Sequence, residues 1–148
     1  MSLELSSRDI HTCNCTAMRK ASRRLSQVYD AALAPVGLRS TQYSLLLELS
    51  HHIDESPTMR EIADSMVMDR STLVRNIKPL EREHLISIQS LGLDRRRRFI
   101  TLTQQGKKKL HEARPYWKAA QETFERRFGP TPADELRKIL LKIASDVD

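Results

Sequence analysis

The stretch from Asp69 to Thr103 constrains the fold of this chain most strongly, because it combines a helical pattern with two short strand-like runs. Its sequence is DRSTLVRNIKPLEREHLISIQSLGLDRRRRFITLT. Leu73, Ile77 and Leu80 recur at the spacing that places apolar side chains on one stripe of a helix. Asp69 suits the position before that helix, since a carboxylate accepts hydrogen bonds from the free N–H groups of a first turn.

The face of this helix opposite the apolar stripe is polar and basic. Short hydroxyls, arginine and asparagine are the groups that hydrogen-bond base edges and phosphates. We therefore predict nucleic-acid contacts, rather than simple exposure, for Arg70, Ser71, Thr72, Arg75 and Asn76. Pro79 lies inside the helix, where it removes a backbone donor. The apolar spacing continues through Leu80, so we expect the helix to persist with a kink after Arg75.

The second half of the stretch predicts a two-stranded hairpin. Leu85, Ile86 and Ile88 form the first strand, Ser90 to Asp94 the turn, and Phe99 to Thr103 the return strand. At the tip lie four consecutive cations, for which phosphate and minor-groove contact is favoured over a solvated charge run: Arg95, Arg96, Arg97 and Arg98. Asp94 is placed to pair with Arg96 and stiffen this tip.

The net charge of +6 and the pI near 9.6 favour a polyanionic partner. The 148 residues suffice for one domain with its own core, at 39% hydrophobic and 30% charged residues. No apolar run reaches the ~20 residues of a membrane span, and no secretory segment precedes the domain, so we expect a cytoplasmic protein. The sequence offers no nucleophile with a paired base, no phosphate-binding glycine loop and no complete metal-ligand set, so neither an enzyme nor a cofactor is expected.

Helices are predicted on both sides of this stretch. The ranges are 12–34, with an apolar stripe from Ala17 to Ala32, a central helix 40–51, a short helix 58–65, a long helix 103–128, and a last helix capped by Thr131. Thr58 and Glu61 have the spacing of a capping box. The outer helices carry more apolar surface than a small core can cover, which favours a two-fold partner. Lys107, Lys108 and Lys109 are read as a solvated helix face.

The chain resembles the MarR family of winged helix-turn-helix regulators. The resemblance rests on the segment MREIADSMVMDRSTLVRNIKPLE and on a D-x-R and L-T-x-x-G pattern, here Asp94, Arg96, Leu102, Thr103 and Gly106. It implies a mainly α fold with a small β-wing, in which 12–34 and 103–147 dimerise and 40–102 forms a DNA-binding lobe. Pro79 and the charges of Arg97 and Arg98 depart from the family pattern.

The resemblance also implies a homodimer on a near-palindromic DNA operator and a pocket between the two regions. Small aromatic acids or phenols are the ligands that it implies. The aromatic side chains Tyr43, Tyr116 and Trp117 are expected either to pack in the core or to line that pocket.

Cys13 and Cys15 permit three interpretations. They are half-buried packing residues near the dimer seam, or redox-sensing thiols, or part of a metal site with His11. Sensing requires a depressed thiol pKa, which a helix N-terminus and Arg19 and Lys20 could supply, and some relatives in the family sense oxidants with a cysteine near this place. A metal site lacks a fourth ligand. His51, His52, Asp54 and Glu55 are read as a solvated loop rather than a metal site.

The function predicted from the sequence is a sequence-specific DNA-binding regulator. It is expected to be a homodimeric repressor, released by a small aromatic ligand or by thiol oxidation. The alternative is a winged-helix module that binds protein or RNA without an operator, and such a module has no need of Arg95 to Arg98.

Overall fold

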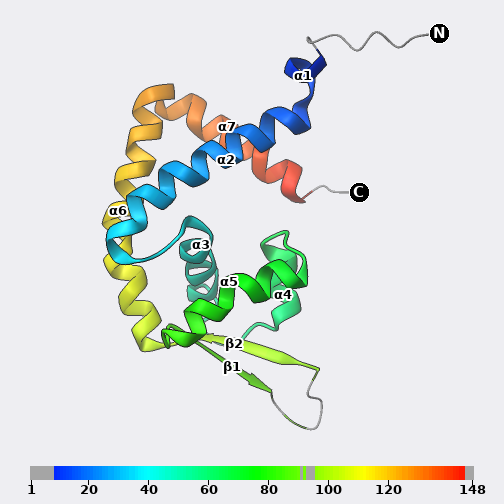
Figure 1. The fold of residues 1–148 in the computed structure, drawn as a ribbon, viewed down its shortest axis with the longest axis vertical. Helices are drawn as coiled ribbons and strands as arrows, with labels where there is room; N and C mark the ends of the chain where they lie inside the picture. Colours follow the sequence, from blue (N-terminus) through cyan, green and yellow to red (C-terminus); the bar gives the residue numbers. More distant parts are fainter. Residues whose placement is uncertain (1–8, 91, 93–95, 146–148) are drawn as a thin grey trace, which may run out of the picture.

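The computed structural model describes residues 9–90, 92 and 96–145, and within them the chain is mainly helical with one small antiparallel sheet (Figure 1). The predicted fold class is confirmed. The elements are α1 Asp9–Thr12, α2 Asn14–Leu33, the 3-10 turn η1 Ala34–Val36, α3 Ser40–Ser50, α4 Met59–Ser65, α5 Arg70–Arg82, β1 Ile86–Ser90, β2 Arg98–Leu102, α6 Gln104–Phe128 and α7 Pro130–Ser145.

The core lies where α3, α4, α5, the sheet and the first half of α6 meet. α3 is central, as predicted, since Tyr43, Leu45, Leu46 and Leu49 are all buried. α5 contributes its apolar stripe of Leu73, Ile77 and Leu80, which are at most 2% exposed. Each such side chain stabilises the fold by roughly 1.5–3 kcal/mol through removal from water, so the buried stripe fixes which face of α5 points outward.

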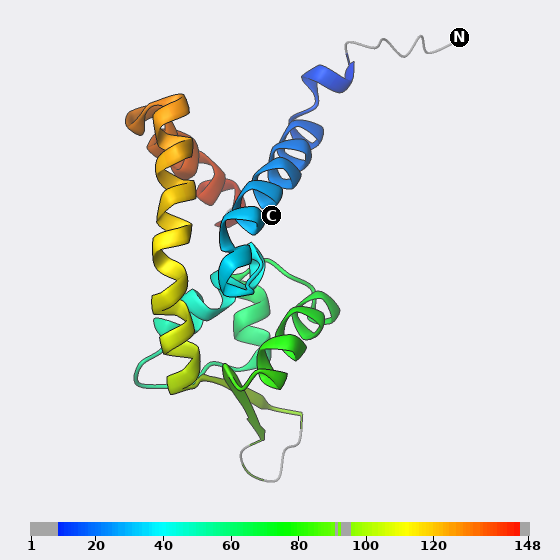
Figure 2. The same cartoon turned by 60° about the vertical axis from the view of Figure 1, so that its left-hand side comes forward.

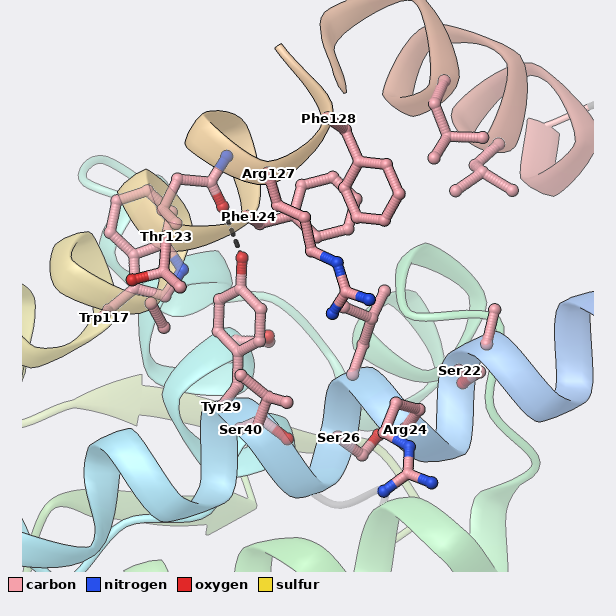
Figure 3. Close-up of a pocket in the computed structure, with 18 of the residues that line it drawn as sticks. Ser22, Arg24, Ser26, Tyr29, Ser40, Trp117, Thr123, Phe124, Arg127 and Phe128 are labelled. Atoms are coloured by element: carbon pink, nitrogen blue, oxygen red, sulfur yellow. Dashed lines mark hydrogen bonds between the residues drawn. The ribbon is translucent and has the colours of Figure 1, made fainter. Parts of the chain in front are cut away.

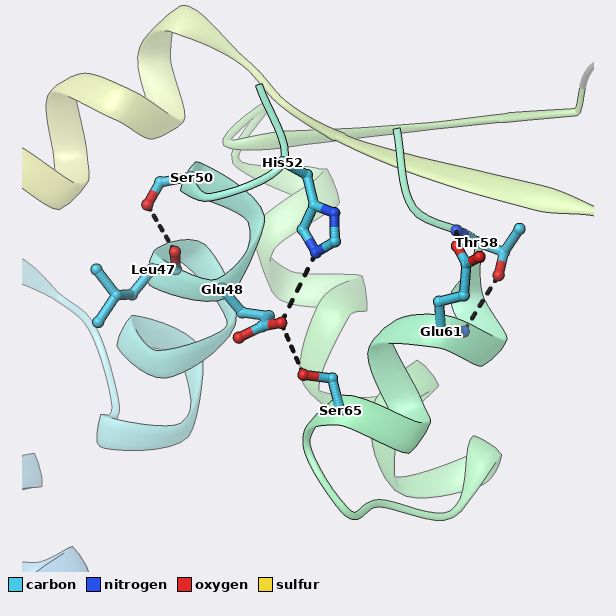
Figure 4. A network of polar contacts seen from close by, with 7 residues as sticks. All are labelled: Leu47, Glu48, Ser50, His52, Thr58, Glu61 and Ser65. Atoms are coloured by element: carbon cyan, nitrogen blue, oxygen red, sulfur yellow. Dashed lines mark hydrogen bonds and ion pairs between the residues drawn. The ribbon is translucent and has the colours of Figure 1, made fainter. Parts of the chain in front are cut away.

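Three predicted helix starts are confirmed. The Thr58 hydroxyl accepts from the Glu61 N–H at 3.1 Å, and the Glu61 carboxylate accepts from the Thr58 N–H at 2.7 Å, which completes the capping box (Figure 4). The Asp69 carboxylate accepts from the Thr72 N–H at 2.7 Å, and the Thr103 hydroxyl accepts from the Gly106 N–H at 3.0 Å. Short polar side chains at these positions satisfy backbone donors that would otherwise lack partners.

α4 and α5 end in the same way. At the end of α4, Val67 donates to Asp64 O and Met68 to Ala63 O, and at the end of α5, His84 donates to Glu81 O and Leu85 to Leu80 O. These pairs are Schellman motifs, in which the residue after the helix adopts a left-handed backbone and is usually glycine. Here Val67 and His84 occupy this left-handed position, with φ of 52° and 58°.

The hairpin is antiparallel, with Ile86 opposite Leu102 and Ser90 opposite Arg98. The segment before α4 extends this sheet. Thr58 forms a β-bridge with Phe99, Ile100 donates its N–H to Pro57 O at 2.9 Å, and the hydroxyls of Ser56 and Thr101 lie 3.0 Å apart. The predicted return strand of 99–103 is shifted by one residue, because Thr103 leaves the sheet to cap α6.

Several predicted details were wrong. The single helix of 12–34 is divided at Cys13, whose extended backbone starts α2, and part of the predicted polar arm forms α1. By contrast, α5 continues through Pro79 as predicted, while the kink after Arg75 stays a prediction. α7 begins at Pro130 and not after a Thr131 cap, because proline suits a first turn whose N–H groups lack partners.

α6 joins the core to an upper region formed by α2 and α7 (Figures 1 and 2). α2 and α7 both pack against α6, and their ribbons cross above the core. α7 buries only Ala133 among its described side chains and leaves five large apolar ones exposed. These five are Leu136, Ile139, Leu140, Leu141 and Ile143.

Candidate nucleic-acid interface

The outward face of α5 is defined by its buried stripe. At 100° per residue, the positions opposite Leu73, Ile77 and Leu80 are Ser71, Arg75, Lys78 and Arg82, all of them exposed. Arg70, beside this row at the start of the helix, is exposed as well. Lys78 was missed in the sequence reasoning, although its spacing from Arg75 and Arg82 could have revealed it.

Two of the predicted contact residues on α5 already make local hydrogen bonds. The Ser71 hydroxyl donates to the Asp69 carboxylate at 2.7 Å, and the Asn76 amide donates to Thr72 O at 2.8 Å. Asn76 and Thr72 are half-buried at the edge of the outward face. Ser71 and Arg75 therefore stand further out than Thr72 and Asn76.

Asp69 is held in its charged form. The hydrogen bond from the Thr72 backbone N–H is the main cause of its lowered pKa, followed by the Ser71 hydroxyl, with a smaller electrostatic contribution from Arg75. Hydrogen bonds to a carboxylate favour the ionised state. At neutral pH the start of α5 thus carries a fixed negative charge beside the cations of the outward face.

The wing, meaning β1, β2 and their connection, presents exposed cations. Arg96, Arg97 and Arg98 are exposed, and Arg98 is the first residue of β2, opposite Ser90. Asp94 and Arg95 lie outside the described residues, so the predicted pair of Asp94 with Arg96 stays a prediction. Side chains alternate between the two faces of a strand, so Arg98 and the buried Ile100 lie on the same face of β2. Arg98 is exposed because it lies beyond the edge of the core.

The carboxylate of Glu61 lies within electrostatic range of the wing. Its pKa is lowered chiefly by the hydrogen bond from the Thr58 backbone, with smaller contributions from the charges of His52 and Arg97. Glu61 lies in the first turn of α4 and Arg97 precedes β2, while the Thr58–Phe99 bridge joins the start of α4 to the wing.

A second polar group connects α3 to α4 (Figure 4). The Ser65 hydroxyl donates to the Glu48 carboxylate at 2.7 Å, and His52 Nε2 lies 3.7 Å from the same oxygen. Glu48 therefore holds the last residue of α4 against α3. α4 is therefore anchored at its last residue by Glu48 and at its start by the Thr58–Phe99 bridge.

A large apolar cavity lies away from the interface, between α2, α6 and α7 above α3 (Figure 3). Its volume is about 1070 Å³. Tyr43 and Trp117 line it and stack with ring centroids 5.9 Å apart. This agrees with the expectation that these aromatic side chains line a pocket. Tyr116, by contrast, is exposed and does not line the cavity.

A chain of hydrogen-bonded polar side chains lies in the wall of the cavity. The Tyr29 hydroxyl donates to Gln121 Oε1 at 2.6 Å (Figure 3). The Gln121 amide donates in turn to Glu125 at 3.3 Å. Burial, and to a lesser degree the charge of Glu125, raises the pKa of Tyr29. The neutral phenol is therefore available to a ligand at neutral pH. The guanidinium of Arg127 also borders the cavity, 5.5 Å from the Phe128 ring centroid.

Both cysteines are exposed thiols in the single chain. Cys13 begins α2, and its sulfur accepts from the Thr16 N–H at 3.5 Å. The pKa of Cys13 is lowered chiefly by the hydrogen bond with the Thr16 side chain and then by the one from the Thr16 backbone, and Arg19 adds a smaller electrostatic contribution. Among the described residues no group of three His, Cys, Asp or Glu side chains could hold a metal ion. Over the same part of the chain, no helix is long and apolar enough to cross a bilayer.

The helix-turn-helix of α4 and α5, followed by an antiparallel wing, makes this a winged helix-turn-helix protein. Eight of its lysines and arginines lie between Asp69 and Thr103, against four acidic residues. Residues 36–97 match the model of the MarR family. The chain belongs to the MarR family.

Individual solved structures are similar to this chain over most of its length. In the DNA complex of the Mycobacterium tuberculosis transcriptional regulator MosR, the protein is 33% identical to this chain, and the match covers 90% of this chain and 94% of that one, with a TM-score of 0.78. The repressor CouR on a 23-mer DNA duplex is 25% identical over 95% of this chain and 99% of its own, with a TM-score of 0.80. The organic hydroperoxide resistance regulator of Bacillus subtilis is 28% identical over 92 residues, which span 62% of this chain and 61% of that protein.

Proposed function

We propose that this protein is a homodimeric transcription regulator, not an enzyme, that binds a near-palindromic DNA operator in the cytoplasm. In each subunit α5 enters the major groove, and the wing contacts the neighbouring backbone and minor groove. Residues 40–102 form the DNA-binding lobe, and 12–34 with 103–147 form the dimerisation region. Repression, released by an effector, is the proposed mode of action.

The observation that carries this proposal is the buried stripe of α5. Because Leu73, Ile77 and Leu80 are committed to the core, Ser71 and Arg75 must face outward. The wing is hydrogen-bonded to the segment before α4, so its exposed arginines keep a fixed position relative to that helix. Arginine pairs with guanine edges and phosphates, and hydroxyls bond phosphates, so this surface suits duplex DNA better than a protein partner.

Binding to the DNA that flanks the protein's own gene, measured by gel shift at several salt concentrations, tests the proposal. A discrete complex that survives competitor DNA is expected. Arg96→Ala should weaken it and reduce the slope of log K against log salt by about 0.9 if one phosphate contact is lost. Lys118→Ala, which removes an exposed cation paired with Glu122 on α6, is the matched control. An unchanged slope in Arg96→Ala contradicts the wing contact.

The exposed surface supports the dimer. The chain exposes 11579 Å², whereas a compact monomer of 17.1 kDa exposes about 7,750 Å². Obligate dimers bury about 2,000–5,000 Å² in total, half of it on each subunit, so a second copy would cover a part of this surplus. A dimer places its two recognition helices about 34–36 Å apart, on successive major grooves.

Two effector routes follow from separate observations. The apolar cavity, with its aromatic walls and the Tyr29 hydroxyl, suits a small aromatic ligand that binds better to a conformation unable to bind DNA. The exposed Cys13, with its lowered pKa, suits oxidation by a peroxide. Gel shifts with and without peroxide separate them, because a thiol reductant restores DNA binding only on the oxidation route. Cys13→Ser removes the peroxide response and leaves DNA binding intact.

A further inference from the structure

The end of α4 lies beyond the buried side chains of that helix. Its buried residues, Met59, Ile62 and Ala63, all fall within its first five residues. Ser65, the last residue of the helix, is exposed, and so is Val67 in the turn that follows. α4 packs mainly against α5 and β2. Burial therefore fixes the start of α4 more firmly than its end.

The turn between α4 and α5 is strained. Val67 has φ of 52°, a conformation that is unfavourable for a β-branched residue. Strained backbone persists only where the surrounding structure holds it in place. The hydrogen bonds from Val67 to Asp64 O and from Met68 to Ala63 O attach the turn to α4. The position of the turn therefore follows the position of the end of α4.

α3 holds the end of α4 through one side-chain contact. The Ser65 hydroxyl donates to the Glu48 carboxylate at 2.7 Å (Figure 4), and a charged acceptor strengthens such a bond. His52 Nε2, at 3.7 Å from the same oxygen, lies beyond hydrogen-bond distance. The Glu48 side chain is 29% exposed, on a helix that the core fixes through four buried side chains. Ser65 is thus attached to a helix that does not itself depend on the turn.

The first turn of α5 precedes the part of that helix that the core holds. The first buried side chain of α5 is Leu73, whereas Arg70 and Ser71 are exposed. Asp69, which caps this turn by accepting from the Thr72 N–H, directly follows the strained segment 66–68. The orientation of Arg70 and Ser71 is therefore set from the end of α4 as well as from the core.

We propose that Glu48 is a positioning residue for DNA sequence recognition. Through Ser65 it holds the end of α4, while the Thr58–Phe99 bridge joins the start of α4 to the wing. Together the two contacts set the first turn of α5 relative to the wing. The inference rests on the proposed function and adds a residue that acts on specificity through another residue, without contacting the DNA.

The positioning role has a consequence that separates it from the charge of Glu48. Base-edge contacts require α5 and the wing to be placed correctly at the same time, whereas phosphate contacts do not read the sequence. Loss of one carboxylate should by itself raise the affinity for any duplex, because phosphates repel it. Glu48→Ala loses the charge and the hydrogen bond, whereas Glu48→Gln loses only the charge and keeps an acceptor for Ser65.

The first test measures DNA specificity with the full chain. One duplex is selected by the wild type from a pool of random sequences, and a second has the same base composition in scrambled order. Fluorescence anisotropy gives the affinity for each at one salt concentration. In Glu48→Ala the ratio of the two affinities should fall by about fivefold, as expected for the loss of one hydrogen bond. Glu48→Gln should keep the wild-type ratio.

Two further variants complete this test. Ser65→Ala should reproduce the loss of Glu48→Ala, and the double variant should lose no more than either single variant, because both remove the same contact. Asp54→Ala is the matched control for charge, since it removes an exposed carboxylate from the loop that follows α3. Its affinity ratio should equal that of the wild type.

The second test needs no DNA. Hydrogen exchange of backbone amides in the free protein reports how firmly the turn is held. In Glu48→Ala, exchange should become faster at the N–H groups of Met68 and Thr72, which bond to Ala63 O and to the Asp69 carboxylate. Exchange at Ile77, in the buried part of α5, should remain unchanged. Glu48→Gln should exchange as the wild type does at all three amides.

Three results overturn the proposal. They are an unchanged affinity ratio in Glu48→Ala, equal ratios in Glu48→Ala and Glu48→Gln, and unchanged exchange at Met68 and Thr72 in Glu48→Ala. Failure of the wild type to select any sequence contradicts the proposed function alone. The exchange measurement then still decides whether Glu48 positions the turn.

Discussion

The carboxylate of Asp30, near the end of α2, accepts a hydrogen bond from the backbone N–H of Ser40 at 2.7 Å and so caps the start of α3. Asp30→Ala removes this cap between the upper region and the core. We expect a loss of about 1–2 kcal/mol of unfolding free energy, measured by urea denaturation. Asp30→Asn keeps an acceptor and should lose clearly less. Equal losses in the two variants would mean that the cap is not the cause.

Replacement of Val67 or His84 by glycine should stabilise the protein, because each residue has a left-handed backbone conformation that glycine adopts without strain. A β-branched residue is particularly unfavourable there. Val67→Gly should raise the unfolding free energy by about 1 kcal/mol, the strain relief of 1–3 kcal/mol being partly offset by chain entropy. His84→Gly should gain less, since histidine tolerates this conformation better. Thermal denaturation checks both, and a lower melting temperature in Val67→Gly would contradict the strain.

A substitution at Gly106 should lower the unfolding free energy, unlike the two glycine substitutions above. A Cβ atom at this position would lie 2.0 Å from Leu85 O and 2.6 Å from Leu102 Cδ1, and the backbone oxygen cannot move without disturbing the hairpin. Gly106→Ala should destabilise the protein by about 1–3 kcal/mol or more. Gly92→Ala is the comparison in open space, although its φ of 79° also costs some strain. Chemical denaturation of the two variants shows whether the contact at Gly106 dominates.

Cys13 predicts a pH-dependent reactivity. Its pKa is lowered because the Thr16 hydrogen bond and the Arg19 charge favour the thiolate. The rate of alkylation by iodoacetamide should therefore rise at lower pH in the folded Cys15→Ser variant than in the same variant in guanidinium chloride. The rate follows the thiolate fraction, so its midpoint reports the pKa directly. Coincident folded and denatured curves would show that the start of α2 does not activate the thiol.

The sequence predicted those parts of the fold that local chemistry determines. Thr58, Asp69 and Thr103 are short polar side chains at the proper distance from an apolar stripe, so their capping roles could be read directly. Leu73, Ile77 and Leu80 likewise fixed the buried face of α5. For the nucleic-acid interface, this spacing would also have revealed Lys78 had the outward row been continued by one more turn.

Other features depend on contacts that are distant in the sequence. The division at Cys13 goes against the usual preferences, since cysteine is not a common cap, whereas at α7 the preference of proline for a first turn prevails over Thr131, a common cap. The stacking of Tyr43 on Trp117 joins α3 to α6, so no local pattern could predict it. The local hydrogen bond of Asn76 depends on its rotamer, which one-letter spacing does not specify.

The contacts of Ser56, Pro57 and Thr58 with β2 have a consequence for how such a protein diversifies. They attach the wing to the start of α4, so the wing, α4 and α5 form one DNA-binding unit. Substitutions on the outer face of this unit can change the preferred operator without disturbing the distant cavity. Substitutions in the cavity can change the effector without altering the DNA-binding unit. Operator and signal can therefore be inherited and exchanged as separate traits, with the junction of α2, α3 and α6 as the part that has to be retained.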